Sequence, residues 1–153
     1  MKKIYIICLL FLTACEKNAE NNLNEAVLNK SSIEHAIMNR WYKQSQLTLG
    51  EKVYRKNCMQ CHNENAKGTQ AWKQLSPDGN YPPPPLNGSA HAWHHDLGTL
   101  TRSIKNGGVP LGGVMPAFKD KLSEQEIRAV IAYFQSFWSD EVYSSWLENG
   151  GLE

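Results

Sequence analysis

The strongest chemical signal in the sequence is a C-x-x-C-H motif at residues 58–62. Residues three apart in a helical turn lie on one face, so the thiols of Cys58 and Cys61 can point the same way. His62 follows directly and offers an imidazole nitrogen on that side. Two thiols can add to the two vinyl groups of one porphyrin while the imidazole ligates its iron. This spacing is the attachment motif of c-type haem, and it predicts one covalently bound haem c with His62 as an axial ligand.

Two other interpretations of the cysteine pair compete with haem attachment. Cys58 and Cys61 could join His91 and His95, whose H-x-x-x-H spacing suits zinc. The stretch between the two pairs is longer than the roughly 12 to 15 residues typical of a zinc finger. A redox-active dithiol is the second rival, but no βαβ pattern surrounds the cysteines and His62 would have no role. Haem attachment accounts for more of the sequence than either rival.

A haem iron held by one histidine needs a sixth ligand or an open site. Met115 follows a glycine-rich loop and precedes a proline, and this setting favours a loop that aims its side chain. We therefore expect the Met115 sulfur to bind the iron opposite His62, an arrangement that gives a higher reduction potential than two histidines. An iron with both axial positions filled favours one-electron exchange over catalysis. The rival sixth ligands are His91, His94 and His95.

The N-terminal residues 1–14 have the layout of a secretory signal, with Lys2 and Lys3 ahead of an apolar run too short to span a bilayer. The run ends in L-T-A-C, which resembles the lipobox of bacterial lipoproteins. That resemblance implies cleavage before Cys15 and lipidation of its sulfur, and acyl chains on this residue would anchor the chain to a membrane. A plain signal peptide is the alternative. We expect a location on the periplasmic side of a bacterial membrane, either the inner or the outer membrane.

The rest of the sequence predicts helices and loops, because no stretch shows sustained period-two alternation. Thr48-x-x-Glu51 and Ser123-x-x-Glu126 have the pattern of helix-starting capping boxes. A further helix is expected within 91–106, the glycine- and proline-rich stretch 63–90 reads as a loop, and a last short helical turn is expected near the C-terminus. The apolar residues expected on these helices are Leu49, Val53, Tyr54, Leu97, Leu100, Ile104, Ile127, Val130, Ile131, Phe134, Phe137, Trp138, Val142, Trp146 and Leu147.

The order of motifs resembles a bacterial class I cytochrome c with a single haem. C-x-x-C-H is followed by P-x-L-x-G at 84–88, by M-P-A-F at 115–118 and by a capped helix carrying Tyr133. The resemblance implies an all-α fold with several helices wrapped round one haem. It also implies that the first and last helices of the domain cross, with Gly50 and Tyr54 facing Tyr133 or the residue after it.

The resemblance further implies that the backbone carbonyl of Pro84 accepts the Nδ1 proton of His62, which would fix the ring. Trp93 and Arg102 are candidates for hydrogen bonds to the haem propionates, with ordinary packing and a solvated charge as their alternatives. The expected segments are a lipoprotein signal peptide at 1–14, a flexible tether at 15–31, an amphipathic helical extension at 32–47, a cytochrome c domain at 48–138 and an acidic tail at 139–153.

The function expected from these residues is single-electron transfer between redox protein partners by a membrane-anchored periplasmic cytochrome, without catalysis of its own. Two alternatives stay open: a haem enzyme or small-ligand binder with a labile sixth ligand, and a fixed cytochrome subunit of a larger oxidoreductase. The formal net charge is +1 and there is no basic run, which argues against a nucleic-acid partner.

Overall fold

The computed structural model describes residues 40–111 and 113–153. The chain divides into two units, and the residues from Tyr42 onward form the second. The signal peptide, the lipidation candidate Cys15, the tether and residues 32–39 of the expected extension lie outside the described residues. Within the described ranges every regular element is a helix and no strand occurs, which confirms the all-α class.

Helix α2 (Gln44–Asn57) leads directly to the C-x-x-C-H motif and begins earlier than the sequence predicted. The expected start at Thr48 is wrong because its hydroxyl donates to the carbonyl of Gln44 at 3.2 Å, a bond made inside a helix. Glu51, expected to complete the cap, pairs instead with Arg55 one turn later at 2.9 Å. Residues 44–47, which the sequence placed in a separate extension, therefore belong to the helix that carries the motif.

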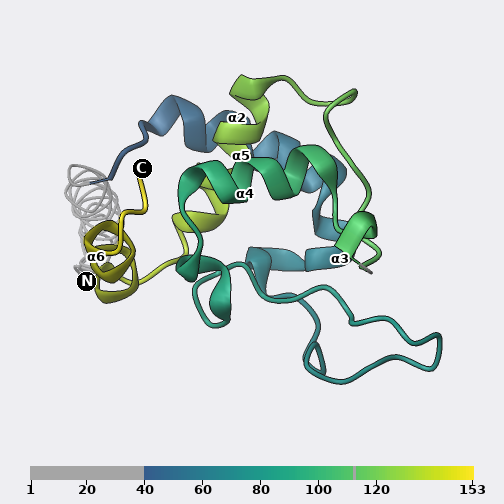
Figure 1. The fold of residues 1–153 in the computed structure, drawn as a ribbon. Coiled ribbons are helices and arrows are strands. Elements are labelled where there is room, and N and C mark those ends of the chain that lie inside the picture. The colour runs from purple at the N-terminus through teal and green to yellow at the C-terminus, as the bar shows by residue number, and fades with distance from the viewer. Residues whose placement is uncertain (1–39, 112) are drawn as a thin grey trace, which may run out of the picture. The chain divides into compact units, whose positions relative to one another are not determined.

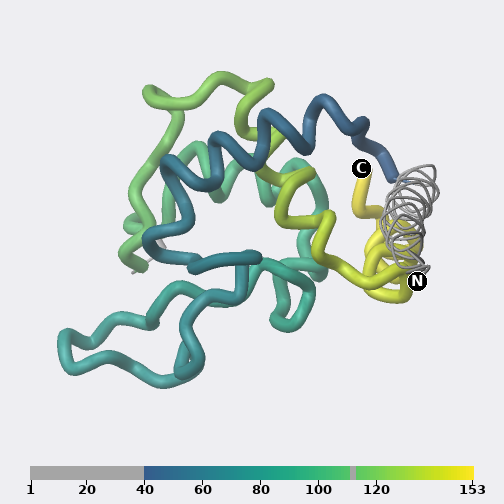
Figure 2. Tube along the Cα trace, turned by 180° about the vertical axis from the view of Figure 1, so that it is seen from behind, coloured from purple at the N-terminus to yellow at the C-terminus, as the bar shows by residue number. Residues whose placement is uncertain are grey.

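Helix α5 (Glu124–Gln135) lies between α2 and α4 (Leu97–Asn106) and packs on both, most extensively on α2 (Figures 1 and 2). Its predicted capping box is confirmed: Ser123 Oγ accepts from the Glu126 amide, and the Glu126 carboxylate accepts from the Ser123 amide. The start of α4 is capped by Asp96, whose carboxylate accepts from the Thr99 amide at 2.7 Å. The buried apolar side chains of α4 and α5 are Leu97, Leu100, Ile104, Ile127, Ala129, Val130, Ile131, Ala132 and Phe134.

The crossing of α2 and α5 depends on Gly50. A Cβ atom at this position would lie 2.0 Å from the carbonyl oxygen of Ala129 and 2.8 Å from the Cβ of Tyr133. Just beyond the crossing, the rings of Tyr54 and Tyr133 pack with their centroids 5.1 Å apart. The absence of a side chain at Gly50 thus lets the two backbones meet, as the family resemblance implied.

Between the helices, the chain runs through loops with three short 3₁₀ turns: η1 (Glu64–Ala66), η2 (His91–His94) and η3 (Val109–Leu111). Residues 69–83 form a long loop that extends away from the helices (Figure 1). The prediction of loop structure over 63–90 is confirmed, apart from the single turn of η1.

The acidic tail contains a full helix, α6 (Asp140–Glu148), where the sequence predicted only a short turn. Ser139 caps it through a bond from the Val142 amide. Tyr143 and Trp146 are buried, with 3% and 1% of their surfaces exposed. The longer helix is explained by this burial, because a helix as short as α6 is marginal without tertiary packing. None of the helices in the described ranges has the length and hydropathy that crossing a bilayer requires.

Candidate haem-binding site

The C-x-x-C-H motif forms one compact turn at the end of α2. Cys58 caps α2, and α3 (Met59–His62) begins at the next residue. The amides of Cys61 and His62 donate to the Cys58 carbonyl at 3.1 and 2.8 Å. This turn brings the two thiols and the imidazole to positions i, i+3 and i+4, which lie on one side of a helix. Both cysteines are free thiols, with Cys58 partly buried and Cys61 exposed.

The imidazole of His62 is buried, with 8% of the residue exposed, and has one defined partner. Its Nδ1 lies 2.9 Å from the backbone carbonyl oxygen of Pro84. A carbonyl oxygen can only accept, so Nδ1 carries the proton and Nε2 keeps its lone pair. Burial lowers the pKa of His62 and outweighs the opposing effect of the Pro84 bond, so the ring is neutral near pH 7. A neutral imidazole with a free Nε2 is suited to bind iron.

The Pro84 carbonyl is held in place by a ladder of backbone hydrogen bonds to the segment that follows the motif. The Thr69 amide donates to Pro83 at 2.9 Å, and the Leu86 amide donates to Ala66 at 2.8 Å. These two bonds flank Pro84 on both sides. The segment after His62 and the proline run therefore form one unit, which presents the carbonyl to the imidazole.

Met115 lies on the loop that follows η3 and is partly buried. Its carbonyl accepts from the Gly108 amide at 2.9 Å, and the Phe118 amide donates back to Ile104 at 3.1 Å. These bonds tie both ends of the loop to the C-terminal end of α4. The backbone at Met115 is thus held at a defined place, as a side chain that aims at a cofactor requires.

Gly107 allows this loop to approach α4 closely. Its φ of +71° lies in the region that favours glycine, and a Cβ here would be 2.5 Å from the Met115 carbonyl oxygen. Gly107→Ala should therefore displace the Met115 backbone and lower the free energy of unfolding by about 1–3 kcal/mol. We expect denaturant titration to show the loss and the visible spectrum to show weaker thioether ligation. Gly79→Ala, which also has positive φ but meets no atom within 4 Å, is the control. Equal effects of both substitutions on the spectrum would contradict this role for Gly107.

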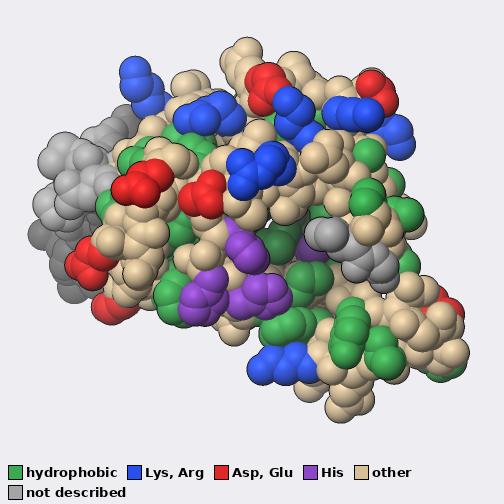
Figure 3. Space-filling view, viewed as in Figure 1, with side chains coloured by type: hydrophobic (Ala, Val, Ile, Leu, Met, Phe, Trp, Pro, Cys, Tyr) green, Lys and Arg blue, Asp and Glu red, His purple; other side chains and the backbone are tan. Residues whose placement is uncertain are grey.

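A cavity of about 510 Å³ adjoins the His62 partner, because Pro84 forms part of its wall. The remaining lining residues are Trp72, Lys73, Tyr81, Pro82 and His91. The Lys73 ammonium lies 5.1 Å from the Trp72 ring centroid, and the Trp72 and His91 rings are 5.6 Å apart. Figure 3 shows this face of the molecule hollowed beside a group of histidine side chains, with hydrophobic side chains inside the hollow.

The donor set of the C-x-x-C-H turn fits a haem. Two thiols and a neutral imidazole share one turn, and the imidazole is oriented by the carbonyl of Pro84, a residue that also lines the neighbouring cavity. Lys73 and His91 are polar groups that could meet the carboxylates of a porphyrin. The sequence motifs did not indicate Lys73 and Tyr81. Both belong to the polar loop that precedes the proline run at 82–85, and a basic and an aromatic residue in such a loop are the sequence feature that could have indicated them.

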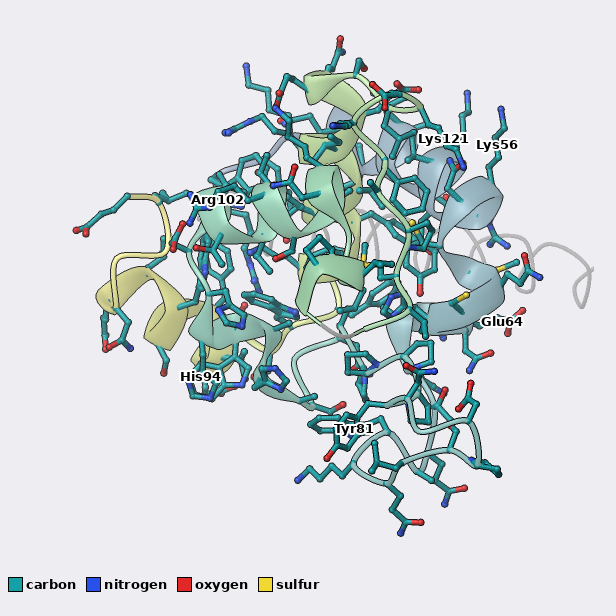
Figure 4. All side chains as sticks on the ribbon, turned by 45° about the vertical axis from the view of Figure 1, so that its right-hand side comes forward. Lys56, Glu64, Tyr81, His94, Arg102 and Lys121 are labelled. Atoms are coloured by element: carbon teal, nitrogen blue, oxygen red, sulfur yellow. The ribbon has the colours of Figure 1, made fainter. Side chains whose placement is uncertain are left out.

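Trp93 and Arg102, the residues predicted to contact propionates, have local partners. Trp93 stacks on His94 with ring centroids 3.8 Å apart. Arg102 is exposed, and its guanidinium donates to Thr99 Oγ1 at 2.6 Å. Figure 4 shows Arg102 on α4 and His94 on η2, both on the side away from α3, while Tyr81 comes from the long loop. The structure thus does not bring Arg102 to the C-x-x-C-H turn.

The two rival interpretations of the cysteine pair gain no support. In residues 40–111 and 113–153, no group of three or more His, Cys, Asp or Glu residues is placed to hold a metal ion, so the zinc set is not assembled. His91 and His95 pack edge to face with centroids 5.8 Å apart. Burial, followed by the neighbouring Cys61, raises the pKa of the Cys58 thiol to about 11. A thiol that stays protonated at neutral pH is a poor redox nucleophile.

Comparison with known families decides between these interpretations. A family model described as Cytochrome C oxidase, cbb3-type, subunit III matches residues 45–134. The chain belongs to this family. It is therefore a c-type cytochrome, a class of electron-transport proteins, and membership implies covalently bound haem c.

The relatives of this cytochrome are considerably longer proteins. A cbb3-type cytochrome c oxidase subunit FixP from Sinorhizobium medicae is 30% identical over 129 residues, which cover 82% of this chain and 41% of the relative. A subunit CcoP from Rhodobacter capsulatus is 34% identical over 96 residues, which cover 58% of this chain and 28% of the relative. A CcoP from Azospirillum brasilense is 32% identical over 106 residues, which cover 69% of this chain and 30% of the relative. The cytochrome thus spans less than half the length of each. No solved structure gives a significant match.

Proposed function

We propose that this cytochrome binds one haem c through thioethers from Cys58 and Cys61, ligates its iron with His62 and Met115, and carries single electrons between redox proteins. The observation that carries the proposal is the buried His62 ring, whose Nδ1–H donates to Pro84 and whose Nε2 stays free. A single haem is inferred because the sequence contains one C-x-x-C-H motif.

The haem supplies reversible one-electron chemistry, and the protein's own groups decide how easily it proceeds. His62 is held by a backbone carbonyl and Met115 by a tethered loop, so neither ligand has to move far when the iron changes charge. With His62 and Met115 both bound, the iron would have no open position for a substrate. Electron transfer without catalysis follows from this arrangement. The aromatic and proline side chains of the cavity beside Pro84 would give a bound haem apolar surface on that side.

The proposed location is the periplasmic side of a bacterial membrane, held by lipid on Cys15. The support is the signal-like sequence at 1–14 and its L-T-A-C ending. The tether at 15–31 would then separate the anchor from the cytochrome domain. For the domain we propose the boundaries 48–138, extended at its start by residues 44–47 because these lie in α2.

The proposal is tested by the mass of the full chain produced with its own signal in a host that matures c-type cytochromes. We expect one additional haem that resists acid-acetone extraction. Replacing both Cys58 and Cys61 by alanine should abolish the covalent haem completely, because no thioether can form. Gln60→Ala, an exposed change within the same turn, is the control and should keep it. Zinc or free thiols in the purified wild-type chain would overturn the proposal.

A second candidate is that this cytochrome is a fixed subunit of a larger oxidoreductase. The names of the relatives favour it, since each is a subunit of a cbb3-type cytochrome c oxidase. Gel filtration of detergent extracts, followed by haem absorbance, separates the two candidates. Elution at the mass of the single chain supports a mobile carrier, whereas stable co-elution with oxidase activity supports the subunit.

A further inference from the structure

Two tryptophans near the C-terminus reach across the fold to the segment that carries Pro84. The indole Nε1–H of Trp138 donates to the Leu86 carbonyl at 2.8 Å. The indole Nε1–H of Trp146 donates to the His95 carbonyl, also at 2.8 Å. Both side chains are buried, with 2% and 1% of their surfaces exposed. Each bond joins residues more than 50 positions apart in the sequence, so neither is a product of local structure.

These two side chains form one unit with α6. Their rings meet edge to face with centroids 5.9 Å apart, and Tyr143 packs against Trp146 at 5.4 Å. The carbonyl of Gly151 accepts from the Leu97 amide at 2.8 Å, which ties the end of the chain to the start of α4. The C-terminal part of the chain, from Trp138 onward, is thus bonded to the segment from Leu86 to Leu97 at three points.

The hydrogen bond from Trp138 is accepted by Leu86, two residues after Pro84, whose carbonyl orients His62. The Leu86 amide donates to Ala66, while the Leu86 carbonyl accepts from Trp138, so this residue is held on both sides. The segment 84–96 contains only the single turn of η2, and its own hydrogen bonds, from Ser89 to Asn87 and from His95 to Ala92, are short-range. Its position therefore depends on the contacts it receives from outside, and the tryptophans provide two of them.

We propose that Trp138 and Trp146 are positioning residues for the axial ligand: they hold the 84–96 segment so that the Pro84 carbonyl stays on Nδ1 of His62. The inference rests on the proposed ligation of haem iron by His62. A carbonyl on Nδ1 makes the imidazole a stronger donor, which stabilises the oxidised iron and keeps the reduction potential low. Loosening the segment weakens this bond and raises the potential.

The test uses Trp138→Phe and Trp146→Phe in the haem-loaded full chain. Each substitution keeps an aromatic ring but removes the N–H donor. For Trp138→Phe we expect an upward shift of the reduction potential. We also expect the His62 Nδ1 proton to exchange with solvent about tenfold faster, as loss of the support of one hydrogen bond would give. Trp146→Phe should shift the reduction potential and the exchange rate in the same direction but less, because its partner His95 lies further from Pro84 than Leu86 does.

Leu147→Ala is the matched control, since Leu147 lies on α6 and is 38% exposed. It should change neither the potential nor the exchange rate. If the tryptophan variants unfold more easily but keep the wild-type potential and exchange rate, the two side chains only support packing and the inference is wrong. Should Trp138→Phe not fold, Trp146→Phe decides by the same two measurements. Absence of covalent haem from the wild type would instead overturn the proposed function, and exchange at His62 would still test the hydrogen-bond argument.

Discussion

Met115→Ala is expected to keep the haem covalently attached while abolishing the thioether-to-iron charge-transfer band and lowering the reduction potential. A drop of about 0.2 V is expected, a modest part of the roughly 0.8 V over which axial ligands set haem potentials. The physical reason is that a thioether sulfur stabilises reduced iron better than water or a nitrogen ligand does. Visible spectra recorded during a redox titration give the ligand and the potential in one experiment.

Met59→Leu is the control for this prediction. Met59 lies within the C-x-x-C-H turn itself, so it tests whether removing a sulfur near the haem is enough to change the spectrum. It should leave the band in place and the potential nearly unchanged. A Met115→Ala protein with the wild-type spectrum would show that another residue is the sixth ligand. The histidines at 91, 94 and 95 would then be the next candidates.

Gly50→Val is expected to have the largest effect on stability. The new Cβ would overlap the Ala129 carbonyl oxygen at 2.0 Å, and rigid helix backbones leave it no free space. Helices α2 and α5 would have to separate along their main contact. We expect a loss of more than about 4 kcal/mol, a size that point mutations reach only through defects such as core overpacking.

Chemical denaturation of the haem-loaded protein, followed by absorbance of the haem and by circular dichroism, measures the effect of Gly50→Val. Lys52→Val is the matched control, because it adds the same β-branched side chain to an exposed position of the same helix. Lys52→Val should lower the free energy of unfolding only by the small difference in helix propensity between lysine and valine, well under about 1 kcal/mol. Similar unfolding midpoints for the two variants would show that α2 and α5 do not depend on close approach at Gly50.

The α2–α5 pair also explains how the site is supported. Cys58 is the C-cap residue of α2, so the haem motif continues directly from the helix packed on α5. The hydroxyl of Tyr54 donates to the carbonyl of Asn63, directly after His62, at 2.8 Å. The turn that carries the thiols and the imidazole is therefore fixed at both ends by the same helix.

Local sequence patterns predicted several of the local features correctly. The all-α class follows from periodic apolar residues, and the Ser123–Glu126 cap forms because both partners lie within one helical turn. The same kind of pattern failed at Thr48 and Glu51, where residues 44–47 continue the helix and turn a capping motif into interior residues. A cap depends on what precedes it as well as on its own residues, and a four-residue pattern does not contain that information.

What the sequence determined by itself is the identity of the chemistry, because a C-x-x-C-H turn carries both thiols and the imidazole within five neighbouring residues. Only the tertiary structure decided what surrounds that turn. The family resemblance implied the Pro84 carbonyl beside His62, and the structure has that bond. The Lys73 and His91 side chains at the cavity and the indole of Trp138 reach their places through contacts between distant segments that no motif indicated. Such contacts depend on how whole helices and loops pack, and spacing along the chain does not encode them.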